Sequence, residues 1–380
     1  MRIRSIDFAR GFIMIIMALD HVRDLIHVDY AQNPLDLQNT HPTLFFTRWI
    51  THICAPTFMF LAGASVYLSL KNSSIDSTRT FLISRGIWLI LIEFTVMTFA
   101  IWWDVQFRTL SFIIIGAFGT GFIVLSSLLK FPAKGVGIAG IIIIAFHDAL
   151  SLIPFAEGSV LQKIIAPFFF PAVLPLNADH FLLIGYPPIP WLGILLAGYG
   201  AGLFFEKPEA ERRKLFMRTA YILLALFIAL RFVNRYGDRP WMPQSDPFFT
   251  FLSFINVTKT PPSLLFVLTT IGIAFLLLRL GESVRGDIML VYGRVPFFYY
   301  IVHFYIIHIL MFVITFIQGF SLRDLKFGPF MFGKPDAPSG FDLTGVYIFW
   351  ILLVIAMYPL CKWYGNYKSR HPEKKWLRYL

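Results

Sequence analysis

The feature that most constrains this chain is its first long apolar segment, 6–26, which is long enough to cross a bilayer and yet contains ionisable side chains. These include Asp7, Arg10, Asp20, His21 and Asp24, which lie on either side of the apolar run 12–19. A charge near the bilayer centre costs several kcal/mol. This segment is therefore predicted to face protein or water rather than lipid.

The spacing of these residues places them on one side of a helix. At 100° per residue, Asp7, Arg10, His21 and Asp24 fall within a stripe about 100° wide. Arg10 and His21 lie nearly on one line and are separated by roughly 16 Å along the axis, about half the hydrocarbon thickness. We interpret this stripe as the polar lining of a buried site.

Composition indicates a membrane protein. The chain has 380 residues, of which 57% are hydrophobic and 14% charged, with a mean hydropathy of +0.68. A net charge of +11 would favour a nucleic-acid partner in a soluble protein, but in a membrane protein the positive-inside rule accounts for much of it. We therefore expect membrane lipid and no nucleic acid as a partner. Cys54 and Cys361 fit neither a metal site nor a disulfide framework.

The predicted fold is all-α: a polytopic integral membrane bundle of about ten transmembrane helices, one domain over 1–380 with a basic cytoplasmic tail over 363–380. Loop charge favours a cell-membrane protein with both termini cytoplasmic, since 28–44 lacks Lys and Arg and 155–187 has only Lys163. The basic loop 233–260 argues mildly against this orientation. The expected spans are about 6–27, 45–70, 82–102, 109–129, 134–154, 188–206, 214–232, 261–281, 294–317 and 343–362.

His21 is the first candidate for chemistry, because an imidazole beside a carboxylate can act as a general base. Asp24, three residues further on, has the better helical geometry to orient it. Asp20 points about 100° away and could instead pair with Arg23 or with an imidazole of another helix. The simpler alternative is that these groups only make polar contacts between helices.

Two further histidines follow. Arg48 and His52 are four residues apart and should share one helical face, so His21, His41 and His52 could converge at the outer mouth of the first two spans. No metal is expected, since no metal-ligand spacing of histidines occurs. Gly63 would permit the close approach of another helix.

Later segments add other candidates. Lys259 precedes the span 261–281, where the helix dipole disfavours a cation, which indicates that it binds an anionic group. His303 and His308 are five residues apart, so only one of them should face the site. No phosphate loop, Gly-x-Ser-x-Gly elbow or dinucleotide fingerprint is present, and a nucleotide site of the soluble type is not expected.

Several motifs carry a resemblance to a known family. The stretches 4–11 (RSIDFARG) and 55–63 (APTFMFLAG) resemble the catalytic-domain family of heparan-α-glucosaminide N-acetyltransferase, and more closely its bacterial membrane relatives. The segments 186–191, 256–263 and 293–300 also resemble those relatives. Arg10 and His21, with ten residues between them, are similar to the signature of the acyltransferase type 3 superfamily.

The resemblance implies a transmembrane acyltransferase that moves acetyl from cytosolic acetyl-CoA, as co-substrate, to an extracytoplasmic sugar or related acceptor. His21 falls where the superfamily has its essential histidine. His41 is the nearest counterpart of the catalytic histidine of the lysosomal enzyme, His27 is a weaker one, and His52 stands where that family has an aspartate. The resemblance leaves three questions open: which histidine is the base, whether acetyl passes directly or through an acyl-histidine, and whether the protein is a homodimer.

We therefore expect catalysis from His21 or His41 as base, with Asp20 or Asp24 orienting it and His52 nearby. Arg10, near the cytosolic end, is expected to bind CoA. The further candidates for this binding are Asp7, Arg48, Lys259, Arg294 and His303. The rival hypothesis is a proton-coupled transporter that uses Asp7, Asp20, His21 and Asp24 as a relay. A membrane scaffold without activity would leave the charged stripe unexplained.

Overall fold

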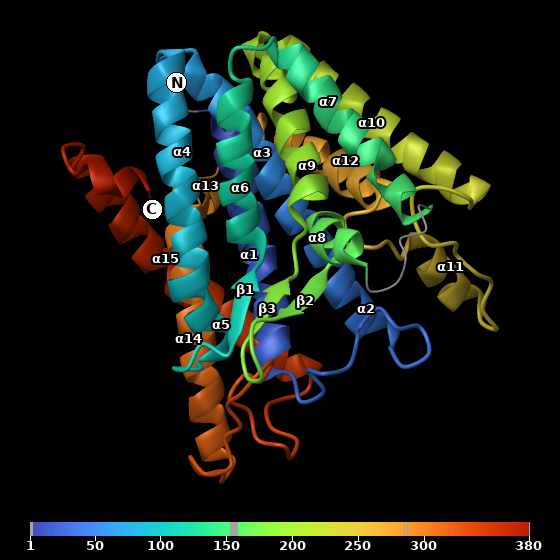
Figure 1. Cartoon of the computed structure of the whole chain (residues 1–380), viewed down its shortest axis with the longest axis vertical. Helices are drawn as coiled ribbons and strands as arrows, with labels where there is room; N and C mark the ends of the chain where they lie inside the picture. The colour runs from blue at the N-terminus through green and yellow to red at the C-terminus, as the bar shows by residue number, and fades with distance from the viewer. Residues whose placement is uncertain (1–2, 153–158, 285, 287, 380) are drawn as a thin grey trace.

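Helix α1 (Arg4–Ile26), which contains the charged stripe, lies in the middle of the helical bundle (Figure 1). The computed structural model describes residues 3–152, 159–284, 286 and 288–379. Most residues of α1 are buried. It contacts α3 (Cys54–Leu70), α12 (Leu264–Gly281), α13 (Ile288–Gly293), α14 (Pro296–Ile317) and α15 (Leu343–Arg370). The charged helix thus faces protein on most sides.

The other helices surround this centre. Helix α2 (Pro42–Trp49) continues through a 3-10 turn, η1 (Ile50–Ile53), into α3, and α4 (Ile75–Ile92) continues through a π-helical turn, η2 (Glu93–Met97), into α5 (Thr98–Trp102). The remaining elements are α6 (Ile114–Leu128), α7 (Ala133–Phe146), η3 (His147–Leu152), α8 (Val160–Phe169), α9 (Pro188–Ala201), η4 (Gly202–Glu206), α10 (Glu209–Val233), α11 (Pro247–Ile255) and η5 (Lys375–Arg378).

The all-α polytopic bundle is confirmed, but ten complete spans are not. Seven helices among the described residues are long and apolar enough to cross a membrane. Each predicted span contains a helix, although 153–154 at the end of span 134–154 lie outside the described residues. Helices α6 and α7 have 15 and 14 residues, or roughly 22 Å, which is short of a hydrocarbon core of about 30 Å. The described spans are Pro42–Leu70, Ile75–Trp102, Pro188–Glu206, Glu209–Val233, Leu264–Gly281, Pro296–Ile317 and Leu343–Arg370.

A small sheet of three strands was not predicted from the sequence. Strand β3 (Phe181–Ile184) pairs in parallel with β1 (Thr109–Phe112) and antiparallel with β2 (Ala172–Pro175). Each strand has only four residues, too few for their periodicity to be distinguished from the adjoining apolar spans. The sheet lies beside the carboxyl-terminal part of α1 (Figure 1).

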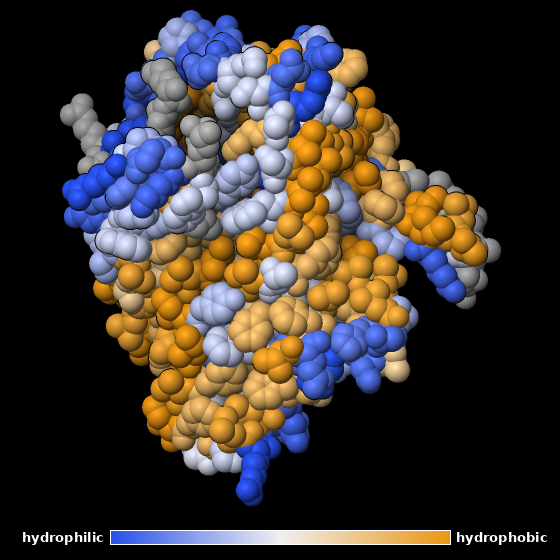
Figure 2. All heavy atoms as spheres, turned by 60° about the vertical axis from the view of Figure 1, so that its left-hand side comes forward, coloured by the Kyte–Doolittle hydropathy of each residue, from blue (hydrophilic) through white to orange (hydrophobic). Residues whose placement is uncertain are grey.

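The outer surface of the bundle is apolar. Large exposed aliphatic side chains lie on the outer faces of α4, α7, α10 and α15. Figure 2 shows apolar residues spread across the middle of one face, with hydrophilic residues gathered mainly toward its ends. A continuous exposed apolar surface of this kind is expected where helices meet lipid.

Two helix crossings are so close that only glycine fits. A Cβ atom on Gly63 of α3 would lie 2.0 Å from the carbonyl oxygen of Leu195 in α9, and one on Gly198 would lie 2.0 Å from that of Phe60. The predicted close approach at Gly63 is therefore confirmed. Likewise, a Cβ on Gly293 of α13 would lie 1.8 Å from the carbonyl oxygen of Asp7 in α1. These crossings fix α9 against α3 and α13 against α1.

The end of α1 is tied to the loop before α15. The backbone N–H of Val28 donates to the carbonyl of Phe341 at 2.9 Å, and that of Phe341 donates to Ile26 at 2.9 Å. From the same loop, Lys334 is 4% exposed; its Nζ donates to the carbonyl of His27 at 3.2 Å and lies 4.0 Å from the ring centroid of Tyr30. This loop closes around the carboxyl end of the charged helix.

Candidate functional site

A cavity of about 680 Å³ runs beside α1, and both Arg10 and His21 line it. Its volume lies within the range usual for small-molecule sites. Six lysine or arginine side chains line it, against two aspartates. We call the part lined by Arg10, Arg85, Arg294 and Lys368 the basic end, and the part lined by Asp20, His21, Arg48, Tyr186 and Lys259 the histidine end.

The basic end combines side chains from four helical regions. Arg10 donates to Oγ of Ser65 at 2.8 Å and to the carbonyl of Leu61 at 3.3 Å, which fixes its guanidinium against α3. Arg294 directly follows the glycine contact between α13 and α1. Among the described residues that line the cavity, the carboxylates are Asp20 and Asp24, and both lie toward the other end. Four cations line this end of the cavity, and such a concentration of positive charge favours an anion.

Two of these cations were missed from the sequence. Arg85 lies within the apolar segment 82–102, whose other charged residue is Glu93, and a charge inside such a segment is a signal that could have been used. Lys368 belongs to the basic tail 363–380 and has no local signal, because α15 continues through that tail as far as Arg370. The helix brings this lysine to the cavity, which pattern alone does not predict.

At the histidine end, a chain of hydrogen bonds fixes the tautomer of His21. Nδ1 of His303 lies 2.8 Å from the carbonyl oxygen of Tyr299, and Nε2 of His303 lies 2.7 Å from Nδ1 of His21. A carbonyl only accepts, so in the neutral pair His303 carries its proton on Nδ1 and its Nε2 must accept. His21 then carries its proton on Nδ1, and its Nε2 keeps a lone pair.

The ring of His21 is also held by aromatic contacts. It lies 4.2 Å from Phe304 and 6.1 Å from Tyr300, between ring centroids. Within the described residues, Nε2 of His21 has no hydrogen-bond partner. A half-buried imidazole with one nitrogen fixed and the other lining a cavity has the geometry that a general base needs.

The prediction that Asp20 or Asp24 orients His21 is wrong. Asp24 pairs with Arg23 instead, and Asp20 pairs with both Arg23, at 2.9 Å, and Arg48. Pairing of Asp20 with Arg23 was among the alternatives for that residue and is confirmed. The reason is electrostatic, since a guanidinium binds a carboxylate more strongly than a neutral imidazole does. The orienting group for His21 is His303, from a helix almost 300 residues away in sequence.

The three histidines of the first two spans do not converge. His41 is exposed at the start of α2, where its Nδ1 accepts from the backbone N–H of Leu44. His52 is 2% exposed and packs its ring edge against Phe266, with neither nitrogen hydrogen-bonded. Arg48 lines the cavity and His52 does not. The 3-10 turn η1 explains this, because each residue in it advances about 120° instead of about 100°, which turns His52 away from the face of Arg48.

The other predicted residues are divided between the cavity and its surroundings. Asp7 is buried and lines a second cavity of about 380 Å³, which Arg10 also borders. His303 contacts His21 but does not itself line the cavity, so its predicted binding of CoA has no support in this arrangement. His308 lies 3.1 Å from the carbonyl of Ala100 and 2.9 Å from that of Phe332. Within the described residues, no three His, Cys, Asp or Glu side chains are grouped to hold a metal ion.

The fold and the cavity define a class: a polytopic helical membrane protein with a cationic cavity that ends at an oriented histidine. Over residues 2–233 the chain matches the family described as Heparan-alpha-glucosaminide N-acetyltransferase, catalytic. This match covers more than half of the chain, which therefore belongs to that family and is a transmembrane acetyltransferase by membership. A search of the curated proteins finds no match.

Proposed function

We propose that this protein transfers an acetyl group from acetyl-CoA, bound at the basic end, to a small acceptor bound at the histidine end. The acceptor would be a carbohydrate or a related molecule with a free hydroxyl or amine. Membership of the acetyltransferase family supports the reaction class. The arrangement of the cavity supports the assignment of its two ends.

The separation of the two ends is the observation that carries this proposal. Arg10 and His21 are eleven residues apart on one helix, or roughly 16 Å. The arm of CoA between its pyrophosphate and its sulfur has about twelve bonds, which extend to roughly 15 Å at about 1.2 Å per bond. Phosphates held by Arg10, Arg85, Arg294 and Lys368 would thus place the thioester near His21.

The chemistry at the histidine end follows from the tautomer. The acceptor oxygen or nitrogen attacks the thioester carbonyl carbon while Nε2 of His21 takes its proton. A C–O or C–N bond forms and the C–S bond breaks. CoA leaves as a thiolate, which takes up the proton from His21. His303 would act as a positioning residue that keeps Nε2 of His21 unprotonated before the reaction.

The same arrangement supports an orientation in the cell membrane. Acetyl-CoA is cytosolic, so the basic end would open to the cytoplasm and the histidine end would receive its acceptor from the other side. Both termini would then be cytoplasmic, as the loop charges also favour. The proton-coupled transporter has less support, because a relay needs carboxylates that change protonation and Asp20 is bonded to two arginines.

The test uses the purified full chain in detergent. Acetyl-CoA should raise its melting temperature, and dephospho-CoA, which lacks the 3′-phosphate, should raise it less. The Arg85→Gln variant should lose most of this shift. Lys163 is a basic residue of α8 that does not line the cavity, so Lys163→Gln should keep the shift.

The second measurement is acetyl transfer. Labelled acetyl should appear on an acceptor, and His21→Ala should abolish that transfer. Equal shifts with CoA and with free adenine would contradict the proposal, as would proton-driven solute uptake without acetyl transfer.

A further inference from the structure

Lys259 is the cation of the histidine end that makes no ion pair with a carboxylate of the described residues. Asp20 is shared by Arg23 and Arg48, and Asp24 is taken by Arg23. Lys259 lines the same cavity and makes no ion pair within the described part of the chain. Its Nζ lies 5.7 Å from the ring centroid of Tyr186. When Arg23, which lies outside the cavity lining, is counted with Arg48 and Lys259, three cations stand against the carboxylates of Asp20 and Asp24, and one positive charge is left over.

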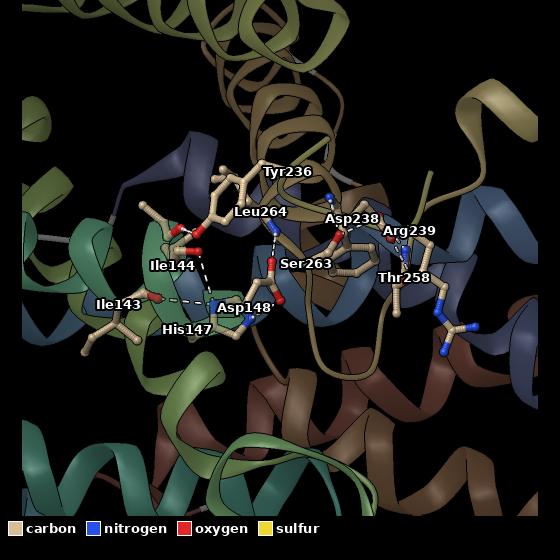
Figure 3. A network of polar contacts seen from close by, with 12 residues as sticks. Ile143, Ile144, His147, Asp148, Tyr236, Asp238, Arg239, Thr258, Ser263 and Leu264 are labelled. Carbon is tan, nitrogen blue, oxygen red and sulfur yellow. Dashed lines mark hydrogen bonds and ion pairs between the residues drawn. The ribbon is translucent and has the colours of Figure 1, made fainter. Parts of the chain in front are cut away.

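The loop that carries Lys259 is held in place on both sides. The carboxylate of Asp238 accepts from the backbone N–H of Thr258 at 2.9 Å, from its Oγ1 at 2.7 Å, and from Oγ of Ser263 at 2.6 Å (Figure 3). Asp238 itself lies in the connection between α10 and α11. The lysine backbone therefore requires little reorganisation when a ligand binds.

A second set of contacts anchors the start of α12, directly after this loop. The backbone N–H of Leu264 donates to the carboxylate of Asp148 at 3.3 Å, and Asp148 also lies 3.2 Å from Nε2 of His147 (Figure 3). The hydroxyl of Tyr236 donates to the carbonyl of Ala145, which joins the α10–α11 connection to the end of α7. Neither Asp238 nor Asp148 lines the cavity, so both act on the loop and leave Lys259 uncompensated.

We propose that Lys259 binds an anionic group of the acceptor, so that the acceptor is a small molecule with a carboxylate or a phosphate as well as the hydroxyl or amine that is acetylated. This inference rests on the proposed function. A lysine ammonium binds either anion as a point charge, and the partial burial of Lys259 strengthens that attraction. A cationic amine without its own anion would add a second uncompensated positive charge beside His21.

The experiment compares matched monosaccharides as acceptors: glucose, glucosamine, glucuronate and glucose 6-phosphate. With labelled acetyl-CoA and the full chain, the KM for an anionic sugar should be lower than that for glucose by a factor of about ten or more. The carboxylate and phosphate arms show which anion is preferred. A preference for glucose or glucosamine overturns the inference, and so does a protein that acetyl-CoA stabilises but that uses none of the four sugars.

Two variants test the role of the lysine itself. Lys259→Met should raise the KM for the anionic sugar about tenfold or more and leave the KM values for glucose and acetyl-CoA unchanged, whereas Lys259→Arg should retain most of the preference. An equal loss with all acceptors would overturn the inference. If acetyl-CoA neither stabilises the wild type nor labels any acceptor, the proposed function fails instead, and the two failures are thereby distinguished.

Discussion

The carbonyl of Tyr299 determines which ring nitrogen of His21 carries the proton, although His21 does not contact that carbonyl. Tyr299 is in the first turn of α14, and its carbonyl oxygen is fixed by the helix; the orientation of His303 follows from it, and that of His21 follows from His303. Groups that orient a reactive imidazole in this way commonly contribute 10–100-fold to activity in metal sites, which gives a scale for the effect here.

The first prediction at this scale concerns His303. Replacing it with Phe removes the acceptor for Nδ1–H of His21, so we expect kcat to fall by about 10–100-fold while the KM for acetyl-CoA is unchanged. His303→Gln offers its Oε1 as a substitute acceptor and should keep more activity than His303→Phe. Equal losses in the two variants, in proteins with wild-type melting temperatures, would show that the hydrogen bond is not responsible.

The second prediction concerns Lys334, in the loop that closes around the end of α1. Burial lowers the pKa of this lysine from its ordinary value of 10.5 to about 8. Between these two values the unfolded chain binds a proton at this lysine and the folded protein does not, so stability increases with pH over that range. The melting temperature of the wild type should therefore rise relative to Lys334→Met from pH 7.5 to pH 10. A difference that stays constant or shrinks would contradict this sign.

At the scale of the element, helix period explains which parts of the site could be predicted. Arg10 and His21 share a cavity because both lie on one regular helix, and the 3.6-residue period is enough to place them. The same rule gives the wrong position for His52, because the 3-10 turn between α2 and α3 changes the advance per residue. The contact of His303 with His21 joins residues of α1 and α14, and no local pattern carries that information.

The third prediction tests the crossing of α3 and α9. Gly63→Ala places a Cβ against the backbone of α9, which no side-chain rotation can relieve, so we expect a loss of about 1–3 kcal/mol of stability, or more. The matched control is Gly135→Ala in α7, where nothing lies within 4 Å of the added atom. That substitution should leave the melting temperature unchanged or raise it slightly, given the higher helix propensity of alanine. Equal effects of the two substitutions would exclude the close contact as the cause.

At the scale of the whole molecule, the fold class and membrane character could be predicted from composition alone, whereas the number of complete spans could not. Helices α6 and α7 are apolar and pack against neighbouring helices, but both are too short to cross the hydrocarbon core. Hydropathy measures how apolar a segment is. A turn that ends a helix early changes the hydropathy of the segment little, so hydropathy does not show where the helix stops. The three short strands were missed for the same reason.

The fourth prediction tests the continuity of the cavity. Ala62 lines it on α3, between Phe58 and Ser65, and therefore between the histidine end and the basic end. Ala62→Trp should obstruct the passage, so acetyl transfer should fall by at least about 100-fold, consistent with the cost of misplacing the reacting groups. The stabilisation by 3′,5′-ADP, which carries phosphates but no pantetheine arm, should persist. Transfer at the wild-type rate would show that the donor does not reach His21 along this route.

The residues around the cavity come from nearly the whole length of the chain. The region shared with the family ends at Val233, yet Lys259, Arg294, Tyr300, Phe304, Phe332 and Lys368 complete the walls, and His303 holds the imidazole. A fragment cut after Val233 would keep Arg10 and His21 but would expose them to whatever solvent or lipid replaced residues 234–380. The region that matches the family is thus smaller than the region that must fold to enclose the cavity.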